Sequence, residues 1–559
     1  MKLIVLILLS VLSSGYADDV EPRVKTPLGG IKGYYKLSHE GRQYEAYEGI
    51  PYAIPPVGKL RFKPPQEIMA WPGELQAMKF GSPCLQYAHV PQNPQERVEG
   101  AEDCLYLNIY TPVRDNKDEL IPVFFWIHGG AFQYGTGMIY NPKYLMDSDV
   151  ILVTINYRLG PLGFLSTEDD VVPGNMGLKD QSMALRWVSE NIESFGGDSK
   201  KVTLVGLSAG GASVHYHYLS PLSAGLFQNG ISLSGTALDC WTQTENSLEK
   251  AKKLGSLMGC PTENNKELVR CLKYRPSKAL VQAVGDFMPW LYNPFTPFGP
   301  VVEKAGDAPF INRSPIEVIT SGAVQDVPWI TGVVSEEGLY PVAEFAGKEQ
   351  LLKELDDNWE SIAPHLLDFN YTVPKEKHVE IARKIKEHYF GSKLIDKLSV
   401  KSLIQMVGDR LFVVDAEKAA RVQAKVNESP VWFYYFSYKG ASSTSEFLSG
   451  TKEDFGVSHA DDARYILDLW YKNEFTTVES LMQKKLISIW VSYAMKKVPD
   501  IGTEWHELDS SKKDMYYLHI ASPDRIYMEL NSNLGEKNFW RTIDFEENKL
   551  KGWTEKDEF

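Results

Sequence analysis

Residues 203–216 read TLVGLSAGGASVHY and indicate both a fold and a candidate functional residue. The apolar run 202–206 has the composition of a buried strand, and the residues after Ser208 can form a helix. Ser208 therefore lies on a tight strand–turn–helix corner, where a serine can be held up as a nucleophile. Gly206 and Gly210 flank it because a side chain there would collide with the neighbouring strand or helix. Since glycines also end ordinary strands, a plain strand–helix turn stays an alternative.

Short apolar runs of the same kind alternate with helix-like segments through much of the chain. The strand candidates are 123–127, 150–155, 202–206, 230–234, 328–333 and 431–436. Between two of them, residues 181–195 place apolar side chains on one helical face. Several of these strands are apolar on both faces, as expected of a parallel sheet that helices cover on both sides. The sequence predicts an α/β fold with a large, mostly parallel central sheet flanked by helices.

The N-terminal residues predict a secretory signal peptide over residues 1–17. Lys2 precedes the apolar run 3–12, and Gly15-Tyr16-Ala17 supplies the small residues of a cleavage site. This run is too short to span a membrane, and no second long apolar segment or lipid-anchor signal is seen, so we expect no membrane anchor. No long linker divides residues 18–559, which we interpret as one elaborated domain. Export is expected, with retention in the endoplasmic reticulum lumen through the C-terminal KDEF (556–559) as the alternative.

Composition limits the partners and cofactors that we expect. The 559 residues carry a formal net charge of −14, which argues against nucleic acid or an anionic membrane as a partner. No CxxC or HExxH motif occurs, so neither a metal nor another cofactor is expected. Three sequons predict glycosylation at Asn312, Asn370 and Asn427, and Asn370 is the best of them because proline follows the other two triplets.

A second glycine-containing motif precedes the serine turn along the chain. The strand in FFWIHGGAF (124–132) ends in His128-Gly129-Gly130-Ala131, a loop of the type that presents backbone N–H groups to an oxyanion. Small residues are needed there because a bulky side chain would block the approach of a substrate. The amides of Gly130 and Ala131, together with that of Ala209 at the start of the next helix, are the predicted oxyanion hole.

Several longer stretches carry a family resemblance. Residues 49–53, 102–112 (EDCLYLNIYTP), 175–198 (NMGLKDQSMALRWVSENIESFGGD) and 202–211 (VTLVGLSAGG) resemble the type-B carboxylesterase/cholinesterase family. Within it, the chain is most similar to secreted insect carboxylesterases of the venom-esterase type. The resemblance implies an α/β-hydrolase fold and a serine carboxylesterase that forms an acyl-enzyme intermediate.

The resemblance also implies the residues that complete a catalytic triad with Ser208. Glu337 in GVVSEEGLY (332–340) matches the acid of the family, and His459 in FGVSHADDARY (455–465) matches its histidine. The chain order serine, acid, histidine is that of α/β-hydrolases. We expect the other histidines near the serine in sequence, His128, His215 and His217, to be packing or surface residues. The neighbouring acids Glu336, Asp461 and Asp462 are expected to be solvated charges.

Further pairings are implied by the resemblance alone. The disulfides are Cys84–Cys104 and Cys260–Cys271, which leaves Cys240 free and buried. The ion pairs are Arg61–Glu102 and Arg158–Asp180, which hold loops around the site, and the hydroxyl of Ser234 is expected beside the acid.

Departures from the family pattern predict the substrate class. No tryptophan lies between Cys84 and Cys104, where cholinesterases carry one for quaternary ammonium groups. Leu207 stands where cholinesterases have glutamate and juvenile hormone esterases typically have glutamine. With the aromatic stretch 287–300, which includes Phe298, Leu207 is expected to line a pocket for neutral, hydrophobic esters. A non-catalytic adhesion protein and a sequestering protein with slow turnover are the alternatives, and the oligomeric state stays open.

Overall fold

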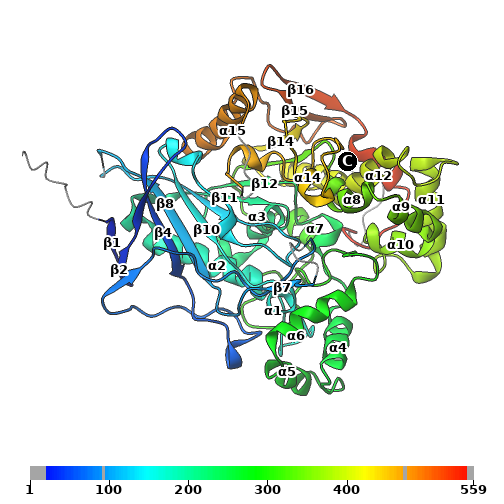
Figure 1. The fold of residues 1–559 in the computed structure, drawn as a ribbon, viewed down its shortest axis with the longest axis horizontal. Helices are drawn as coiled ribbons and strands as arrows, with labels where there is room; N and C mark the ends of the chain where they lie inside the picture. Colours follow the sequence, from blue (N-terminus) through cyan, green and yellow to red (C-terminus); the bar gives the residue numbers. More distant parts are fainter. Residues whose placement is uncertain (1–20, 91–94, 117, 470–474, 550–559) are drawn as a thin grey trace, which may run out of the picture.

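The computed structural model describes residues 21–90, 95–116, 118–469 and 475–549. The predicted signal peptide (1–17) and the C-terminal KDEF (556–559) lie outside these ranges. Within them, eleven strands form one sheet in the order β16-β15-β14-β13-β12-β11-β9-β10-β8-β4-β3 (Figure 1). The strands are β3 (Tyr34–Leu37), β4 (Gln43–Pro51), β8 (Tyr106–Pro112), β9 (Ile121–Ile127), β10 (Ile151–Ile155), β11 (Gly197–Leu207), β12 (Asn229–Leu233), β13 (Trp329–Val334), β14 (Val431–Phe436), β15 (Met515–Ser522) and β16 (Arg525–Asn531).

The central part of this sheet is parallel and its edges are antiparallel. The pairs from β10 through β9, β11, β12, β13 and β14 to β15 are all parallel. The outer pairs β3–β4, β4–β8, β8–β10 and β15–β16 are antiparallel. All six strand candidates fall on strands, and the predicted α/β fold is confirmed. Parallel strands end at the same edge of a sheet, so β11, β12 and β13 deliver the residues after them to one place.

Helices cover both faces because the inner strands are apolar on both faces. All seven residues of β9 are buried. Phe124 and Trp126 of β9 pack on Trp490 of α15 (Thr477–Lys496), with ring centroids 5.4 and 6.0 Å apart. Their neighbours Phe125 and Ile127 belong to the core on the other face, where α2 (Met176–Asn191) and α3 (Ala209–Leu219) lie. This alternation is what a strand buried on two sides requires.

Helix α2 differs from its prediction at both ends. The apolar spacing predicts a helix over 181–195, whereas α2 begins at Met176 and its last turn, Ile192–Phe195, is a 3-10 helix. The early turns were missed because they bury polar residues. Lys179 pairs with Glu303 at 2.7 Å, and Asp180 is fully buried.

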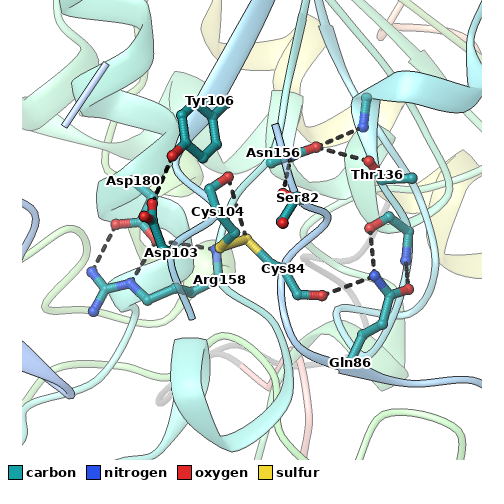
Figure 2. The surroundings of a disulfide bond; sticks show 12 residues. Ser82, Cys84, Gln86, Asp103, Cys104, Tyr106, Thr136, Asn156, Arg158 and Asp180 are labelled. Atoms are coloured by element: carbon teal, nitrogen blue, oxygen red, sulfur yellow. Dashed lines mark hydrogen bonds and ion pairs between the residues drawn. A yellow bond between two sulfur atoms is a disulfide. The ribbon is translucent and has the colours of Figure 1, made fainter. Parts of the chain in front are cut away.

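Both expected disulfides are present, and Cys240 is free and buried. Cys84–Cys104 closes a loop that contains β6 (Gln86–Tyr87) and β7 (Val98–Glu99). Figure 2 shows this bond between the Arg158–Asp180 pair and a hydrogen-bonded network around Gln86 and Asn156. Both expected ion pairs are also formed: the shortest distances are 2.6 Å in Arg61–Glu102 and 2.7 Å in Arg158–Asp180.

Two further features concern the surface. Of the helices that the structure describes, none has the length and apolarity needed to cross a bilayer. Among the sequons, Asn312 is exposed, whereas Asn370 and Asn427 are half-buried. Both polar side-chain atoms of Asn427 are buried without a hydrogen-bond partner in the described part of the chain. Accessibility therefore favours Asn312, whereas the triplets themselves favour Asn370; glycosylation stays a prediction.

Candidate active site

Ser208 occupies a strained turn between β11 and α3. Its φ is 59° and its ψ is −124°, a backbone conformation that costs a non-glycine residue about 1–3 kcal/mol. A Cβ on Gly206 would lie 2.2 Å from the carbonyl oxygen of Gly210, and one on Gly210 would lie 2.0 Å from that of Ile127. Both flanking positions therefore require glycine, as expected. The turn places the Ser208 hydroxyl at the end of β11 and at the start of α3.

The glycine loop that follows β9 packs directly on this turn. A Cβ on Gly129 would lie 2.6 Å from the carbonyl oxygen of Leu207 and 3.0 Å from the Cβ of Ser208. The φ values of Gly130 (110°) and Ala131 (52°) turn the loop sharply, and Ala131 bears strain at a position better suited to glycine.

Three backbone amides in this region have no acceptor in the part of the chain that the structure describes. No hydrogen bond from the N–H groups of Gly130, Ala131 or Ala209 is found within the described residues. Ala209 is the first residue of α3, where N–H groups have no acceptor inside the helix and the helix dipole is positive. N–H groups without an acceptor can donate to an oxygen atom that gains negative charge.

Glu337 and His459 form a buried pair at the same edge of the sheet. Glu337 follows β13 and is fully buried; its Oε1 accepts a hydrogen bond from the Val334 N–H at 2.8 Å. Its Oε2 lies 2.6 Å from Nδ1 of His459. Because an ionised carboxylate can only accept, Nδ1 donates and the lone pair of the neutral ring lies on Nε2.

That second ring nitrogen is left available. Nε2 of His459 is buried and has no hydrogen-bond partner in the described part of the chain. No hydrogen bond joins Ser208 to His459 in this structure; such bonds are often long without a bound substrate. Ser208 and His459 are each 7% exposed, so only a molecule that enters the protein can reach them.

An aromatic wall connects His459 to the glycine loop. Phe412 lies 4.8 Å from the His459 ring, between centroids, and Trp241 lies 5.8 Å from Phe412. Phe132, which ends the glycine loop, lies 6.3 Å from Trp241. Tyr340 also stacks on the His459 ring, with centroids 5.6 Å apart. The surroundings of the pair are therefore apolar and aromatic.

The acids beside the pair are not solvated, so that expectation was wrong for Asp461 and Asp462. Asp461 is 4% exposed and accepts hydrogen bonds from the Ser443 hydroxyl at 2.6 Å and the Ser458 N–H at 2.8 Å. Asp462 is 3% exposed and accepts one from the Tyr434 hydroxyl at 2.6 Å. Ser443 and Tyr434, which donate from distant segments, are partners that the local sequence could not reveal.

Glu336 is half-buried and also holds the histidine loop. Its Oε2 accepts the Val457 N–H at 2.7 Å, and its own N–H donates to the carbonyl oxygen of Val457 at 3.2 Å. Two adjacent glutamates thus have different tasks: Glu336 binds the backbone of the loop, and Glu337 binds the imidazole that the loop carries.

The histidines nearest to Ser208 in sequence are packing residues, as expected. His128 bonds the carbonyl oxygen of Gly129 at 2.8 Å, and burial lowers its pKa to about 4. His215 bonds Gln423 at 2.9 Å and His217 bonds Ser223 at 2.6 Å, and burial lowers the pKa of each to about 3.

The remaining expected site residues are buried, but the structure does not gather them into one group. Leu207 belongs to the core on the α15 face, and Phe298 belongs to the core on the opposite face. The hydroxyl of Ser234 is buried without a hydrogen-bond partner among the described residues, so it makes no bond to Glu337. Over the same residues, no cluster of histidine, cysteine or carboxylate side chains has an arrangement that would hold a metal ion.

Comparisons with known proteins agree on one family. The profile of the carboxylesterase family matches residues 20–540. Venom carboxylesterase-6 of Apis mellifera is 54% identical over 548 residues, which cover 98% of either chain, and Esterase FE4 of Myzus persicae is 40% identical over 93% of this chain and 92% of its own. The crystal structure of juvenile hormone esterase from Manduca sexta, with OTFP covalently attached, superimposes with a TM-score of 0.81 at 28% identity, covering 93% of this chain and 99% of that one.

Proposed function

This chain belongs to the carboxylesterase family and is a carboxylic ester hydrolase, and we propose that Ser208, His459 and Glu337 are its catalytic residues. The observation that carries the proposal is the 2.6 Å contact between Glu337 and Nδ1 of His459, which leaves Nε2 as a buried base without a hydrogen-bond partner among the described residues. Ser208 is the hydroxyl that the fold delivers to the same sheet edge on a strained turn.

Hydrolysis then takes two steps. Nε2 of His459 accepts the Ser208 proton while the serine oxygen attacks the ester carbonyl carbon. The amides of Gly130, Ala131 and Ala209 donate to the carbonyl oxygen as it becomes negative. The imidazolium returns the proton to the alcohol, which leaves, and water repeats the sequence on the acyl-enzyme to release the acid and free Ser208.

Glu337 has two roles in this scheme. It holds the imidazole in the tautomer whose Nε2 is free to accept, and its charge stabilises the imidazolium that forms. Because the carboxylate is fully buried and anchored by the Val334 N–H, it keeps one orientation through the cycle.

The preferred substrates are neutral, hydrophobic esters. The aromatic wall of Phe132, Trp241, Phe412 and Tyr340 favours apolar groups, and Leu207 adds no charge beside the serine.

Replacement of the serine tests the proposal. Ser208→Ala should lower kcat for p-nitrophenyl butyrate by roughly 10⁴-fold or more, because the nucleophile is removed. Ser199→Ala, at the other end of β11, is the matched control and should keep wild-type kcat. Release of more than one equivalent of product per enzyme would show turnover, whereas a protein that only sequesters the ester would release one equivalent. Wild-type kcat in the Ser208 variant would overturn the assignment.

We further propose that the protein is exported. The signal peptide predicted over residues 1–17 supports this, and two disulfides are typical of oxidising compartments. Fusion of residues 556–559 to a secreted reporter tests the alternative. Recovery of the reporter in the medium is expected, and its retention in the endoplasmic reticulum would contradict export of the esterase.

A further inference from the structure

The Cys84–Cys104 loop carries a histidine to the wall of the candidate site. Gln86 in this loop exchanges two hydrogen bonds with the backbone of Gly135, at 2.8 and 3.2 Å, and so fastens the loop to the end of the glycine loop. His89 follows three residues later and is 1% exposed. Arg97 donates to the carbonyl oxygen of His89 at 2.7 Å and fixes its backbone.

Three tyrosines surround the His89 ring. The ring stacks on Tyr292, with centroids 4.8 Å apart and planes 10° apart, and the edge of Tyr134 meets it at 5.0 Å. Nδ1 of His89 lies 2.8 Å from the hydroxyl of Tyr340, and the Tyr134 hydroxyl donates to the same oxygen at 3.4 Å. The imidazole therefore has a fixed position and orientation.

This network also assigns the proton on the ring. Since the Tyr340 oxygen accepts from Tyr134, its single proton points to Nδ1 of His89, which must accept it. Burial lowers the pKa of His89 to about 3, so the ring is neutral near pH 7. The ring hydrogen is consequently on Nε2.

Nothing in the described chain accepts that hydrogen. Nε2 of His89 is buried and has no hydrogen-bond partner within residues 21–90, 95–116, 118–469 and 475–549. A buried N–H group without an acceptor costs about 1–3 kcal/mol, and a ligand oxygen that accepts from it removes this cost.

The position of this donor connects it to the reaction. The ring of Tyr340, whose hydroxyl bonds His89, stacks on the imidazole of His459 at 5.6 Å. Tyr340 also meets Phe295, which packs on Trp241 in the aromatic wall. The ring of His89 thus bonds the hydroxyl end of Tyr340, while the aromatic face of Tyr340 stacks on the imidazole of His459.

We propose that Nε2–H of His89 donates a hydrogen bond to a second oxygen of the substrate, remote from the scissile ester. His89 is then a residue that determines specificity, and the preferred esters carry an ether, keto or further ester oxygen in an otherwise apolar chain. The inference rests on the proposed function, because it places the scissile carbonyl at Ser208.

Isosteric pairs of esters test this donor. Each pair consists of p-nitrophenyl esters whose acyl chains have equal length, one with an ether oxygen in place of a methylene, at successive positions. A second series places the oxygen in the alcohol. At one position in one series, the oxygen-containing ester should have a kcat/KM about tenfold higher than its hydrocarbon partner, the value of one hydrogen bond. No preference at any position in either series would overturn the proposal.

Variants sharpen the test, because a ratio between two esters is insensitive to a general loss of activity. His89→Phe keeps an aromatic ring but no donor and should bring the ratio close to one, whereas His89→Gln, which retains an N–H, should restore part of it. If His89→Phe does not fold, His89→Leu, which also lacks a donor, serves instead, and the ratio should again fall close to one. The exposed His506→Phe is the matched control and should keep the wild-type ratio.

An unchanged ratio in His89→Phe or His89→Leu would overturn the role of His89. Such a result leaves the triad untouched, since that assignment fails only if Ser208→Ala still turns over esters. The two proposals therefore fail by different observations.

Discussion

Two disulfide-closed loops of this protein have the same covalent chemistry and different surroundings. Cys84 and Cys104, 20 residues apart, are both buried, and their loop is bonded through Gln86 to the glycine loop. Cys260 and Cys271, 11 residues apart, join the segment after α4 (Ser247–Leu257) to α5 (Asn265–Lys273). The first disulfide helps to build a wall of the candidate site, whereas the second holds two helices together. Removal of either disulfide should therefore lower stability by a similar amount, whereas only removal of Cys84–Cys104 should lower activity.

Arg61 connects the two regions. Its guanidinium makes two hydrogen bonds to Glu102, next to the first disulfide, at 2.6 and 2.7 Å. It also donates to the carbonyl oxygens of Leu272, Lys273 and Arg275, which follow the second disulfide. One buried cation thus holds both loops, so that neither loop is independent of the other.

The largest effect is expected from removal of this link. Arg61→Met leaves the carboxylate of Glu102 and three carbonyl oxygens without their donor, and should lower the free energy of unfolding by about 3–5 kcal/mol in a urea titration. Arg23→Met breaks the more exposed pair with Glu74 and serves as the control, with an expected loss below about 1 kcal/mol. Equal losses in the two variants would show that the loops are not joined through Arg61.

The comparison itself is tested by two double variants. Cys84→Ser/Cys104→Ser and Cys260→Ser/Cys271→Ser should each lower the free energy of unfolding by about 3 kcal/mol, because loops of this size gain similar chain entropy when opened. Only the first should also lower kcat/KM, by roughly 10- to 100-fold, since it displaces the glycine loop. Equal activity losses in both variants would remove the distinction between the loops.

The pH dependence of stability is expected to come from a buried carboxyl group near the site and not from the disulfides. Burial raises the pKa of Asp462, which belongs to neither loop, to about 6. Because an unfolded aspartate titrates near about 3.9, the stability from this group is complete below that value and is lost as pH rises through about 6.

Between pH 4 and pH 7 the free energy of unfolding of the wild-type protein should therefore fall by about 2 kcal/mol more than that of Asp462→Asn. Urea titrations at several pH values measure this difference. The two disulfide variants should run parallel to the wild type over the same range. If the free energy of unfolding of Asp462→Asn changed with pH in the same way as that of the wild type, the raised pKa of Asp462 would be refuted.

The smallest change concerns one side chain of the first loop. Gln86→Met keeps the disulfide but leaves the Gly135 N–H without its acceptor. We expect kcat/KM to fall about tenfold while the disulfide remains formed, as a count of free thiols would show. Unchanged kcat/KM would place the effect of the disulfide elsewhere than in this contact.

A feature of this protein could be predicted from the sequence when the residues that form it lie close together along the chain. The strands and the serine turn follow from local patterns, such as the apolar run 202–206 and the glycines on either side of Ser208. The partners of Ser208 required a family resemblance, because Glu337 and His459 are 122 residues apart and no local pattern joins them.

Contacts without a local or family pattern were missed. His89 and Tyr340 are 251 residues apart, and no local motif marks either of them. Asp461 and Asp462 were expected in solvent because their donors, such as Tyr434, come from other strands and loops. Charge in a sequence does not reveal burial when the compensating group is supplied by the fold.

Covalent labelling of the serine tests the central assignment most directly. The folded protein is treated with a fluorophosphonate, whose phosphorus is attacked by activated serines with loss of fluoride, and the phosphonylated peptide is identified by mass spectrometry. One adduct per chain is expected, on the peptide that contains Ser208, with none in Ser208→Ala and little in His459→Ala. An adduct on another residue, or hydrolysis that continues after Ser208 is fully modified, would contradict the account.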